Sequence, residues 1–151
     1  MAMQLLLWRH CDAEDGAPDA LRRLTTRGRS EAARMARWLS ARLPADARVL
    51  VSPATRAQQT AAALGRAFET VAGLAPGATA GDVLEVAGWP EGEGMTLVVG
   101  HEPALGDVAA QLLHDDTTGP LPKGGIVWLV QADVAAPVVL HVVAEPASVG
   151  R

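Results

Sequence analysis

The chain has 151 residues, of which 49% are hydrophobic and 20% are charged, and its formal net charge is −4 at pH 7. This composition is that of a folded globular protein and argues against a disordered chain. No apolar run approaches the roughly 20 residues that a membrane helix needs, and the negative net charge disfavours nucleic acid as a partner because phosphate backbones attract basic surfaces.

At this length we expect one domain spanning residues 1–151, since no linker, repeat or low-complexity tract divides the chain. The amino terminus lacks the basic leader and apolar segment of a signal peptide. The single cysteine, Cys11, can form neither an internal disulfide nor a cysteine-based zinc site. We therefore expect a cytoplasmic protein with no membrane segment.

Strand and helix patterns alternate along the chain. The alternation, which closes with two strands joined by a short connection, predicts an α/β fold: a three-layer α/β/α sandwich around a mainly parallel sheet. In chain order the predicted elements are a strand over 5–8, a turn over 16–19, a helix over 30–43, a strand over 49–51, a helix over 53–68, a glycine-rich region over 69–94 with one short helix near 82–86, a strand over 96–99, a helix around 105–112, and strands over 126–130 and 138–143.

Anion-binding side chains follow three of these strands. Arg9 and His10 end the first strand, Ser52 ends the second with Arg56 in the next helical turn, and His101 ends the third. In open α/β sheets ligands bind beyond the carboxyl ends of the strands, where helix amino termini also favour anions. Two arginines and two histidines at this edge therefore predict a phosphoryl-binding pocket.

Four segments, LWRHCDA, LTTRGRSEA, VLVSPATRAQQTA and LVVGHEP, resemble the successive motifs of the histidine phosphatase superfamily, whose fold is that of phosphoglycerate mutase. They run from residue 7 to residue 103, and the two remaining strands fit the same architecture, so the resemblance covers nearly the whole chain. The short length, with no long insertion to act as a lid, is most similar to the small phosphohistidine phosphatase branch of SixA type.

The resemblance implies a role for each matching residue. His10 matches the nucleophile, Arg9 and Arg56 match phosphate-binding arginines, and His101 matches the second histidine, which contacts the phosphoryl oxygens. A neutral imidazole can attack phosphorus to form a phosphohistidine, which water then hydrolyses. The implied reaction needs no metal and no cofactor, and the implied partner is a phosphorylated protein carrying phosphohistidine.

A second group of matches is weaker. Arg22 lies where the small branch often has another arginine near the site, with Arg23 as its rival. Leu24, Thr25 and Gly28 match a loop-to-helix signature that we interpret as structural.

The chain departs from the family pattern directly after the nucleophile, where Cys11 replaces the usual glycine. A side chain at this position restricts the backbone and could crowd a bound phosphate. A cysteine phosphatase is a different interpretation, but its Cys-x5-Arg loop is missing because Ala17 stands where the arginine should be. We therefore interpret Cys11 as a spacer.

The second departure is the absence of an evident general acid. Relatives that act on phosphate esters carry an acidic residue after the second helix, and here the stretch VAGLAPGATAGD offers none before Asp82. Because the protonated imidazole of a phosphoramidate leaves more readily than an alkoxide, this absence favours a phosphohistidine substrate over a sugar phosphate. Asp12, Glu14 and Asp82 remain possible substitutes.

Three alternatives stay open at this stage. One is a small-molecule phosphomonoesterase, and another is a weakly active or inactive phospho-binding domain. The third is a metallohydrolase with His10, Asp12 and His101 as ligands, which two adjacent arginines disfavour because they repel a cation. Residues assigned no role are His114, His141 and the four tryptophans, while Lys123 could reach the substrate if its loop approaches the pocket.

Overall fold

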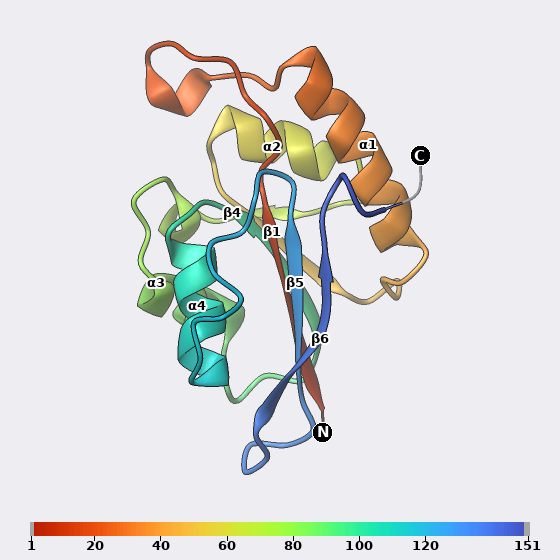
Figure 1. Cartoon of the computed structure of the whole chain (residues 1–151), viewed down its shortest axis with the longest axis vertical. Coiled ribbons are helices and arrows are strands. Elements are labelled where there is room, and N and C mark those ends of the chain that lie inside the picture. The colour runs from red at the N-terminus through yellow and green to blue at the C-terminus, as the bar shows by residue number, and fades with distance from the viewer. Residues whose placement is uncertain (1, 150–151) are drawn as a thin grey trace.

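The computed structural model describes residues 2–149, which form one six-stranded sheet with helices on both faces (Figure 1). The ends of the predicted domain, residue 1 and residues 150–151, lie outside the described residues. The elements are β1 (Met3–Arg9), the short 3-10 helix η1 (Asp19–Leu21), α1 (Thr26–Ser40), β2 (Arg48–Val51), α2 (Thr55–Ala62), β3 (Glu69–Thr70), η2 (Ala72–Leu74), α3 (Ala80–Ala87), β4 (Gly94–Gly100), α4 (Ala104–Leu113), β5 (Ile126–Gln131) and β6 (Val138–Ala144).

The sheet has the strand order β3-β2-β4-β1-β5-β6. The first four strands in this order pair in parallel, and β5 and β6 add to β1 as an antiparallel hairpin. The prediction of a mainly parallel sheet closed by a hairpin is therefore confirmed.

Side chains alternate between the two faces of β1, and both faces are buried. Leu6 and Trp8 pack with residues of α1 and α2, whereas Leu5 and Leu7 pack with residues of α3 and α4. This burial on both sides explains why the strand reads as a continuous apolar run in the sequence. The predicted three-layer sandwich is confirmed, with α1 and α2 covering one face and α3 and α4 the other (Figure 1).

The predicted bounds of two helices were wrong. Helix α1 begins at Thr26 and not at 30, because the Thr25 side chain caps it by accepting the N–H of Gly28 at 2.9 Å, and it ends at Ser40 and not at 43. Helix α2 ends at Ala62, not at 68. The left-handed backbone of Gly65, at φ +67°, turns the chain away shortly after that point.

The glycine-rich region over 69–94 contains more structure than the prediction. Strand β3 and the turn η2 precede α3, which covers the predicted short helix near 82–86 and starts two residues before it. Thr79 and Asp82 form a capping box at the start of α3, each side chain bonding the other's backbone N–H.

None of the helices within residues 2–149 combines the length and the apolar character that crossing a bilayer requires.

Candidate active site

The strand register brings the predicted site residues to one edge of the sheet. Arg9 at the end of β1 lies opposite Gly100 at the end of β4, and Val51 at the end of β2 lies opposite Val99. The residues that follow, His10, Ser52 and His101, therefore leave the sheet at the same edge. The backbone N–H of His10 donates to Gly100 and that of Ser52 donates to Val99, which fixes this arrangement.

The ring of His10 is held in one tautomer. Its Nδ1 lies 2.8 Å from the carbonyl oxygen of Cys11, and because a carbonyl only accepts, Nδ1 carries the proton and Nε2 keeps its lone pair. Burial, and to a lesser extent the positive charges of Arg56 and Arg9, lower the pKa of His10 to about 4. At neutral pH the imidazole is thus uncharged and has the lone pair that a nucleophile needs.

His101 stands beside His10, with the two ring centroids 5.2 Å apart. Its Nε2 lies 2.8 Å from the Ser52 hydroxyl, which also accepts the N–H of Ala54. Burial lowers the pKa of His101 to about 3. In the tautomer in which Ser52 donates to Nε2, the neutral ring carries its proton on Nδ1, and Nδ1 has no partner in the structure.

Arg9 and Arg56 are anchored from opposite sides. Nη1 of Arg9 donates to the carbonyl of Leu121 at 2.9 Å. Arg56, whose side chain is only 5% exposed, donates from Nη1 to the carbonyl of Asp19 at 2.9 Å and from Nη2 to its carboxylate at 3.1 Å. Their charges both act on His10 and on His101, so the four residues share one small region.

Buried donors without a partner mark this region as an anion site. Four buried side-chain nitrogens among the described residues lack a hydrogen-bond partner, and three of them are Arg9 Nε, Arg56 Nε and His101 Nδ1. Buried polar groups are normally satisfied, because an unpaired one costs free energy. A tetrahedral oxyanion offers several acceptors at once, so it fits these three donors.

Comparison with known proteins agrees with this geometry. The model of the histidine phosphatase superfamily (branch 1) matches residues 5–78. The phosphohistidine phosphatase SixA of Escherichia coli K12 is 38% identical over 127 residues, which cover 76% of this chain and 77% of that protein. The chain belongs to the histidine phosphatase superfamily.

Solved structures of SixA proteins share the whole fold of this histidine phosphatase family member. The protein histidine phosphatase SixA in complex with tungstate has a TM-score of 0.81 at 31% identity, over 96% of this chain and 98% of that one. A putative phosphohistidine phosphatase SixA from Nakamurella multipartitia has a TM-score of 0.83 at 28% identity, over 98% of both chains. The phosphoglycerate mutase-like fold that the motifs imply is thereby confirmed.

The structure places Arg22, and not Arg23, toward the site of this family member. Arg22 donates from Nε to Asp19 at 3.0 Å and from Nη1 to the carbonyl of Glu14 at 3.0 Å, and its charge contributes to lowering the pKa of His10. The side chain of Arg23 is exposed. Leu24, by contrast, is buried, as expected for a structural residue.

The side chain of Cys11, which the sequence suggested could crowd a bound phosphate, points away from the site into the core. Its side chain is fully buried in a small cluster with Leu24 and Ala32, and its backbone is outside the left-handed region that requires glycine. Its N–H donates to the hydroxyl of Thr60 at 3.1 Å. Burial raises the pKa of the thiol to about 12, so Cys11 stays protonated and serves as a spacer.

Two of the three candidate general acids are engaged in other hydrogen bonds. Asp12 accepts the Thr25 hydroxyl at 2.7 Å and Lys123 at 3.1 Å, contacts that lower its pKa and keep it ionised. Asp82 caps α3. Glu14 is exposed in the loop that precedes Arg22.

Glu102 is a further carboxyl group next to the site. It accepts the backbone N–H of Gly106 in the first turn of α4 at 2.9 Å, so its carboxylate acts as a cap for that helix. Burial raises the pKa of Glu102, but this contact with Gly106 favours the ionised form.

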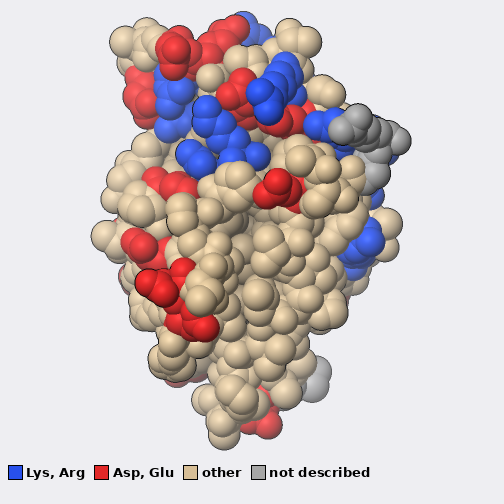
Figure 2. Space-filling model, in the orientation of Figure 1, with Lys and Arg blue, Asp and Glu red and all other residues tan. Residues whose placement is uncertain are grey.

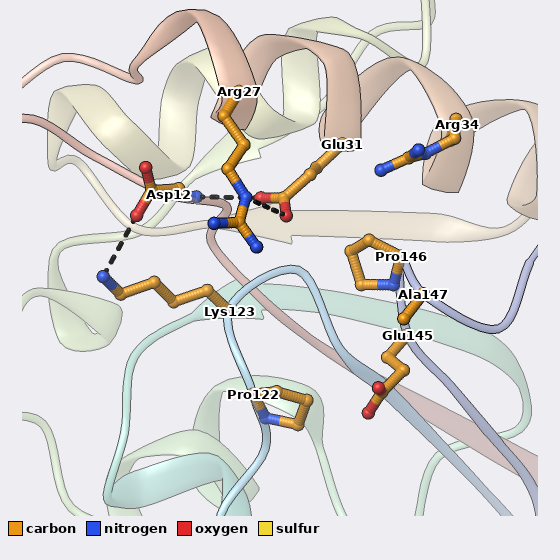
Figure 3. Close-up of a pocket in the computed structure, with 9 residues that line it drawn as sticks. All are labelled: Asp12, Arg27, Glu31, Arg34, Pro122, Lys123, Glu145, Pro146 and Ala147. Atoms are coloured by element: carbon orange, nitrogen blue, oxygen red, sulfur yellow. Dashed lines mark hydrogen bonds and ion pairs between the residues drawn. The ribbon is translucent and has the colours of Figure 1, made fainter. Parts of the chain in front are cut away.

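Lys123 bonds to Asp12, and the pair borders a separate hollow of about 420 Å³ (Figure 3). In Figure 3 the Lys123 ammonium reaches across to Asp12, and Arg27 bonds Glu31, which lies next to Asp12. The idea that Lys123 reaches the substrate is not supported by this contact, because the ammonium is already paired.

The two histidines outside the site lie in positions that a structural role explains. His114 ends α4 in the left-handed conformation at φ 54°, and His141 on β6 packs edge-on against Trp128 at 4.8 Å. Within residues 2–149 no group of three or more His, Cys, Asp or Glu side chains is placed to hold a metal ion. Asp12, which the metallohydrolase alternative requires as a ligand, is bound by Thr25 and Lys123.

Basic side chains gather at the same end of the molecule. Figure 2 shows them near the end at which β1 leaves the sheet, ringed by acidic side chains, while much of the visible surface below carries few charges. The basic side chains gathered at this end attract an anionic group.

Sequence reasoning missed two polar residues that support the site. Asp19 holds Arg56 and Arg22, and the buried Thr60 joins Cys11 N–H to the carbonyl of Arg56. Asp19 lies outside the four motif segments, and Thr60 lies within VLVSPATRAQQTA but received no role, because spacing alone gave no signal for either residue.

Proposed function

We propose that this protein is a metal-independent phosphatase that removes the phosphoryl group from phosphohistidine on a protein, through a covalent phospho-His10 intermediate. The observation that carries the proposal is the meeting of an uncharged His10 with three unpaired buried donors, Arg9 Nε, Arg56 Nε and His101 Nδ1. The name of the Escherichia coli relative, phosphohistidine phosphatase SixA, supports the same substrate.

The first half of the reaction transfers the phosphoryl group to the enzyme. Nε2 of His10 attacks phosphorus in line, so that a P–N bond forms to His10 as the P–N bond to the substrate imidazole breaks. The equatorial oxygens carry the charge throughout, and the guanidiniums of Arg9 and Arg56 stabilise it. We assign His101 a binding role, because a nearby dianion raises the pKa of an imidazole and lets it donate to the oxygens.

The second half returns the enzyme to its starting state. Water attacks the phosphorus of phospho-His10, the bond to Nε2 breaks, and inorganic phosphate leaves. Nδ1 of His10 keeps its bond to the Cys11 carbonyl in both halves, which holds the ring in line.

The carboxylates explain the choice of a phosphoramidate. An alkoxide leaves with difficulty unless an acid protonates it. Asp12 is held by Thr25 and Lys123, which lower its pKa, and Asp82 accepts the backbone N–H of Thr79 at the start of α3. The leaving imidazole of a protonated phosphohistidine needs no such acid. The engagement of Asp12 and Asp82 in these contacts favours phosphohistidine over a phosphate ester as the substrate.

The test compares substrates with one enzyme preparation. A phosphohistidine peptide, a phosphoserine peptide and p-nitrophenyl phosphate are incubated with the wild-type protein and with His10→Ala, with and without EDTA. We expect rapid release of phosphate from phosphohistidine alone, its loss in His10→Ala, and no effect of EDTA. Efficient hydrolysis of the esters with phosphohistidine untouched would identify a small-molecule phosphomonoesterase, and oxyanion binding without turnover would identify a phospho-binding domain.

We also propose that the protein works in the cytoplasm as a single domain acting on a phosphorylated protein. The single buried cysteine suits a reducing compartment. Cell fractionation with an antibody to the protein tests the location, and recovery in an extracellular or envelope fraction would contradict it.

A further inference from the structure

Asp19 binds two arginines of the candidate site at once. Its carboxylate oxygens lie 3.0 Å from Nε of Arg22 and 3.1 Å from Nη2 of Arg56, and its carbonyl oxygen accepts Nη1 of Arg56 at 2.9 Å. One residue thus contacts a guanidinium from α2 and another from the loop after η1. Both terminal nitrogens of Arg56 point to Asp19, while Nε of the same group has no partner.

The contacts of Asp19 are not those of a core residue. Its side chain is 58% exposed, and η1, in which it lies, has no buried residue. The Arg56 side chain, by contrast, is 5% exposed. Packing in the core therefore does not explain an aspartate at position 19. Its contacts with two guanidinium groups do explain it.

Holding an arginine in advance has a clear benefit for phosphoryl transfer. A free arginine side chain samples many rotamers, and fixing it on binding costs conformational entropy. A carboxylate that accepts from a guanidinium fixes its plane, so that the remaining N–H groups keep one direction. In this structure Nε of Arg56 stays an unpaired donor, and the charge of Arg56 acts on both His10 and His101.

We propose that Asp19 is a positioning residue, which presets the guanidiniums of Arg56 and Arg22 for the phosphoryl oxygens of the substrate. The inference rests on the proposed function and deepens it, since it adds Arg22 to the binding set through a shared carboxylate. Asp19 touches no reacting atom and acts through the two arginines. Its negative charge also gives the opposite possibility, a carboxylate that competes with the substrate for the same donors. The direction in which Asp19→Ala changes tungstate affinity separates the two possibilities.

The central experiment replaces Asp19 and measures tungstate binding by calorimetry and kcat/KM on a phosphohistidine peptide. For Asp19→Ala we expect tungstate to bind about 10-fold more weakly and kcat/KM to fall by about 10- to 100-fold, because displaced catalytic groups lose rate steeply. Asp15→Ala is the matched control, since Asp15 is an exposed carboxylate of the same loop. We expect Asp15→Ala to change both quantities less than 2-fold, by the weak effect of one exposed charge.

A double variant shows whether Asp19 acts through the arginines. If it does, Arg22→Ala weakens tungstate binding much less in the Asp19→Ala background than in the wild type, because the two changes remove one arrangement. A merely structural role for Asp19 would give additive effects. Asp19→Asn, which keeps the shape and one acceptor oxygen, should fall between Asp19→Ala and the wild type, and it serves if Asp19→Ala does not fold.

Three results would overturn the inference. The first is tighter tungstate binding by Asp19→Ala, which would make Asp19 a competitor of the substrate. The second is an equal effect of Asp19→Ala and Asp15→Ala. The third is additivity of the Asp19→Ala and Arg22→Ala effects in the double variant. Because tungstate binding needs no turnover, failure of the proposed function is distinguishable. A wild type that binds tungstate but hydrolyses no phosphohistidine peptide refutes the function alone, and the variants still test Asp19.

Discussion

His10 shows how one hydrogen bond and burial prepare a nucleophile. The Cys11 carbonyl fixes the proton on Nδ1, and burial among arginines keeps the second proton off Nε2 at neutral pH. Neither effect is visible in the sequence, where Arg9-His10 reads only as a basic pair. The residue type thus predicts the chemistry, and the surroundings set its protonation state.

The first prediction concerns the protonation of His10. In NMR spectra of ¹³C-labelled histidine rings, we expect His10 to titrate near pH 4, and Arg22→Ala to move that titration toward the ordinary value of 6.5 by removing a positive charge. The His10→Gln spectrum assigns the signal. Titration of His10 near pH 6.5 in the wild type would mean that the ring is not held uncharged.

The second prediction concerns the thiol of Cys11. Because it is fully buried and its pKa is raised to about 12, iodoacetamide should leave the folded enzyme unmodified and active at pH 8. The urea-unfolded protein is the control and should be alkylated at Cys11, as mass spectrometry would show. Alkylation of the folded enzyme in step with loss of activity would show instead that the thiol is accessible.

At the scale of elements, the start of α1 holds the loop that carries His10. The Asp12 carbonyl accepts the backbone N–H of Thr25 at 3.1 Å and faces Gly28 so closely that a Cβ on Gly28 would lie 2.0 Å from it. The signature of Leu24, Thr25 and Gly28 is therefore structural, as the sequence led us to expect. Glycine is needed here for close approach and not for an unusual backbone angle.

The third prediction tests this contact. Gly28→Ala should destabilise the protein by about 3 kcal/mol in urea unfolding, because the methyl group meets a backbone carbonyl that cannot yield easily. Gly81→Ala in the first turn of α3 is the control. Its Cβ would meet only the Thr79 hydroxyl, at 3.7 Å, so we expect a neutral or stabilising change of up to about 1 kcal/mol. Equal effects of the two substitutions would contradict this account of α1.

Helices and strands were predictable to different degrees. Short apolar runs predicted that strands end at or directly before Arg9, Ser52 and His101. That prediction was enough to place the main site residues at one edge of the sheet. The length of α2 was not predictable from its apolar stripe, because Leu64 and Phe68 pack from the segment beyond the helix. The η1 loop gave no periodic signal, so the role of Asp19 emerged only from its contacts.

For the whole molecule, the strand order could not be deduced from the sequence. Placing β4 between β2 and β1 is what sets His101 between the segments that carry Arg56 and His10. The same arrangement buries the imidazoles of His10 and His101 and the guanidinium of Arg56 at one edge. The fold therefore loses stability when those imidazoles must take up a proton.

The fourth prediction follows from this cost. The folded pKa of His10, about 4, lies below the value of 6.5 expected for the unfolded chain, so the unfolded state binds the extra proton as pH falls from 7 to 4. Stability is therefore lost over that range, and we expect a contribution from His10 of about 3 kcal/mol. Urea unfolding of wild type and His10→Gln at pH 7 and pH 4 measures it, and an equal loss in both proteins would refute it.

The most direct test of the account is to trap the phosphorylated enzyme. The protein is mixed briefly with ³²P-labelled phosphoramidate, quenched in alkali, digested and examined by mass spectrometry. We predict label that is stable in alkali and labile in acid, on the peptide that contains His10, and no label in His10→Ala. Label on any other residue, or turnover of the substrate by His10→Ala at the wild-type rate, would contradict the proposal that His10 receives the phosphoryl group.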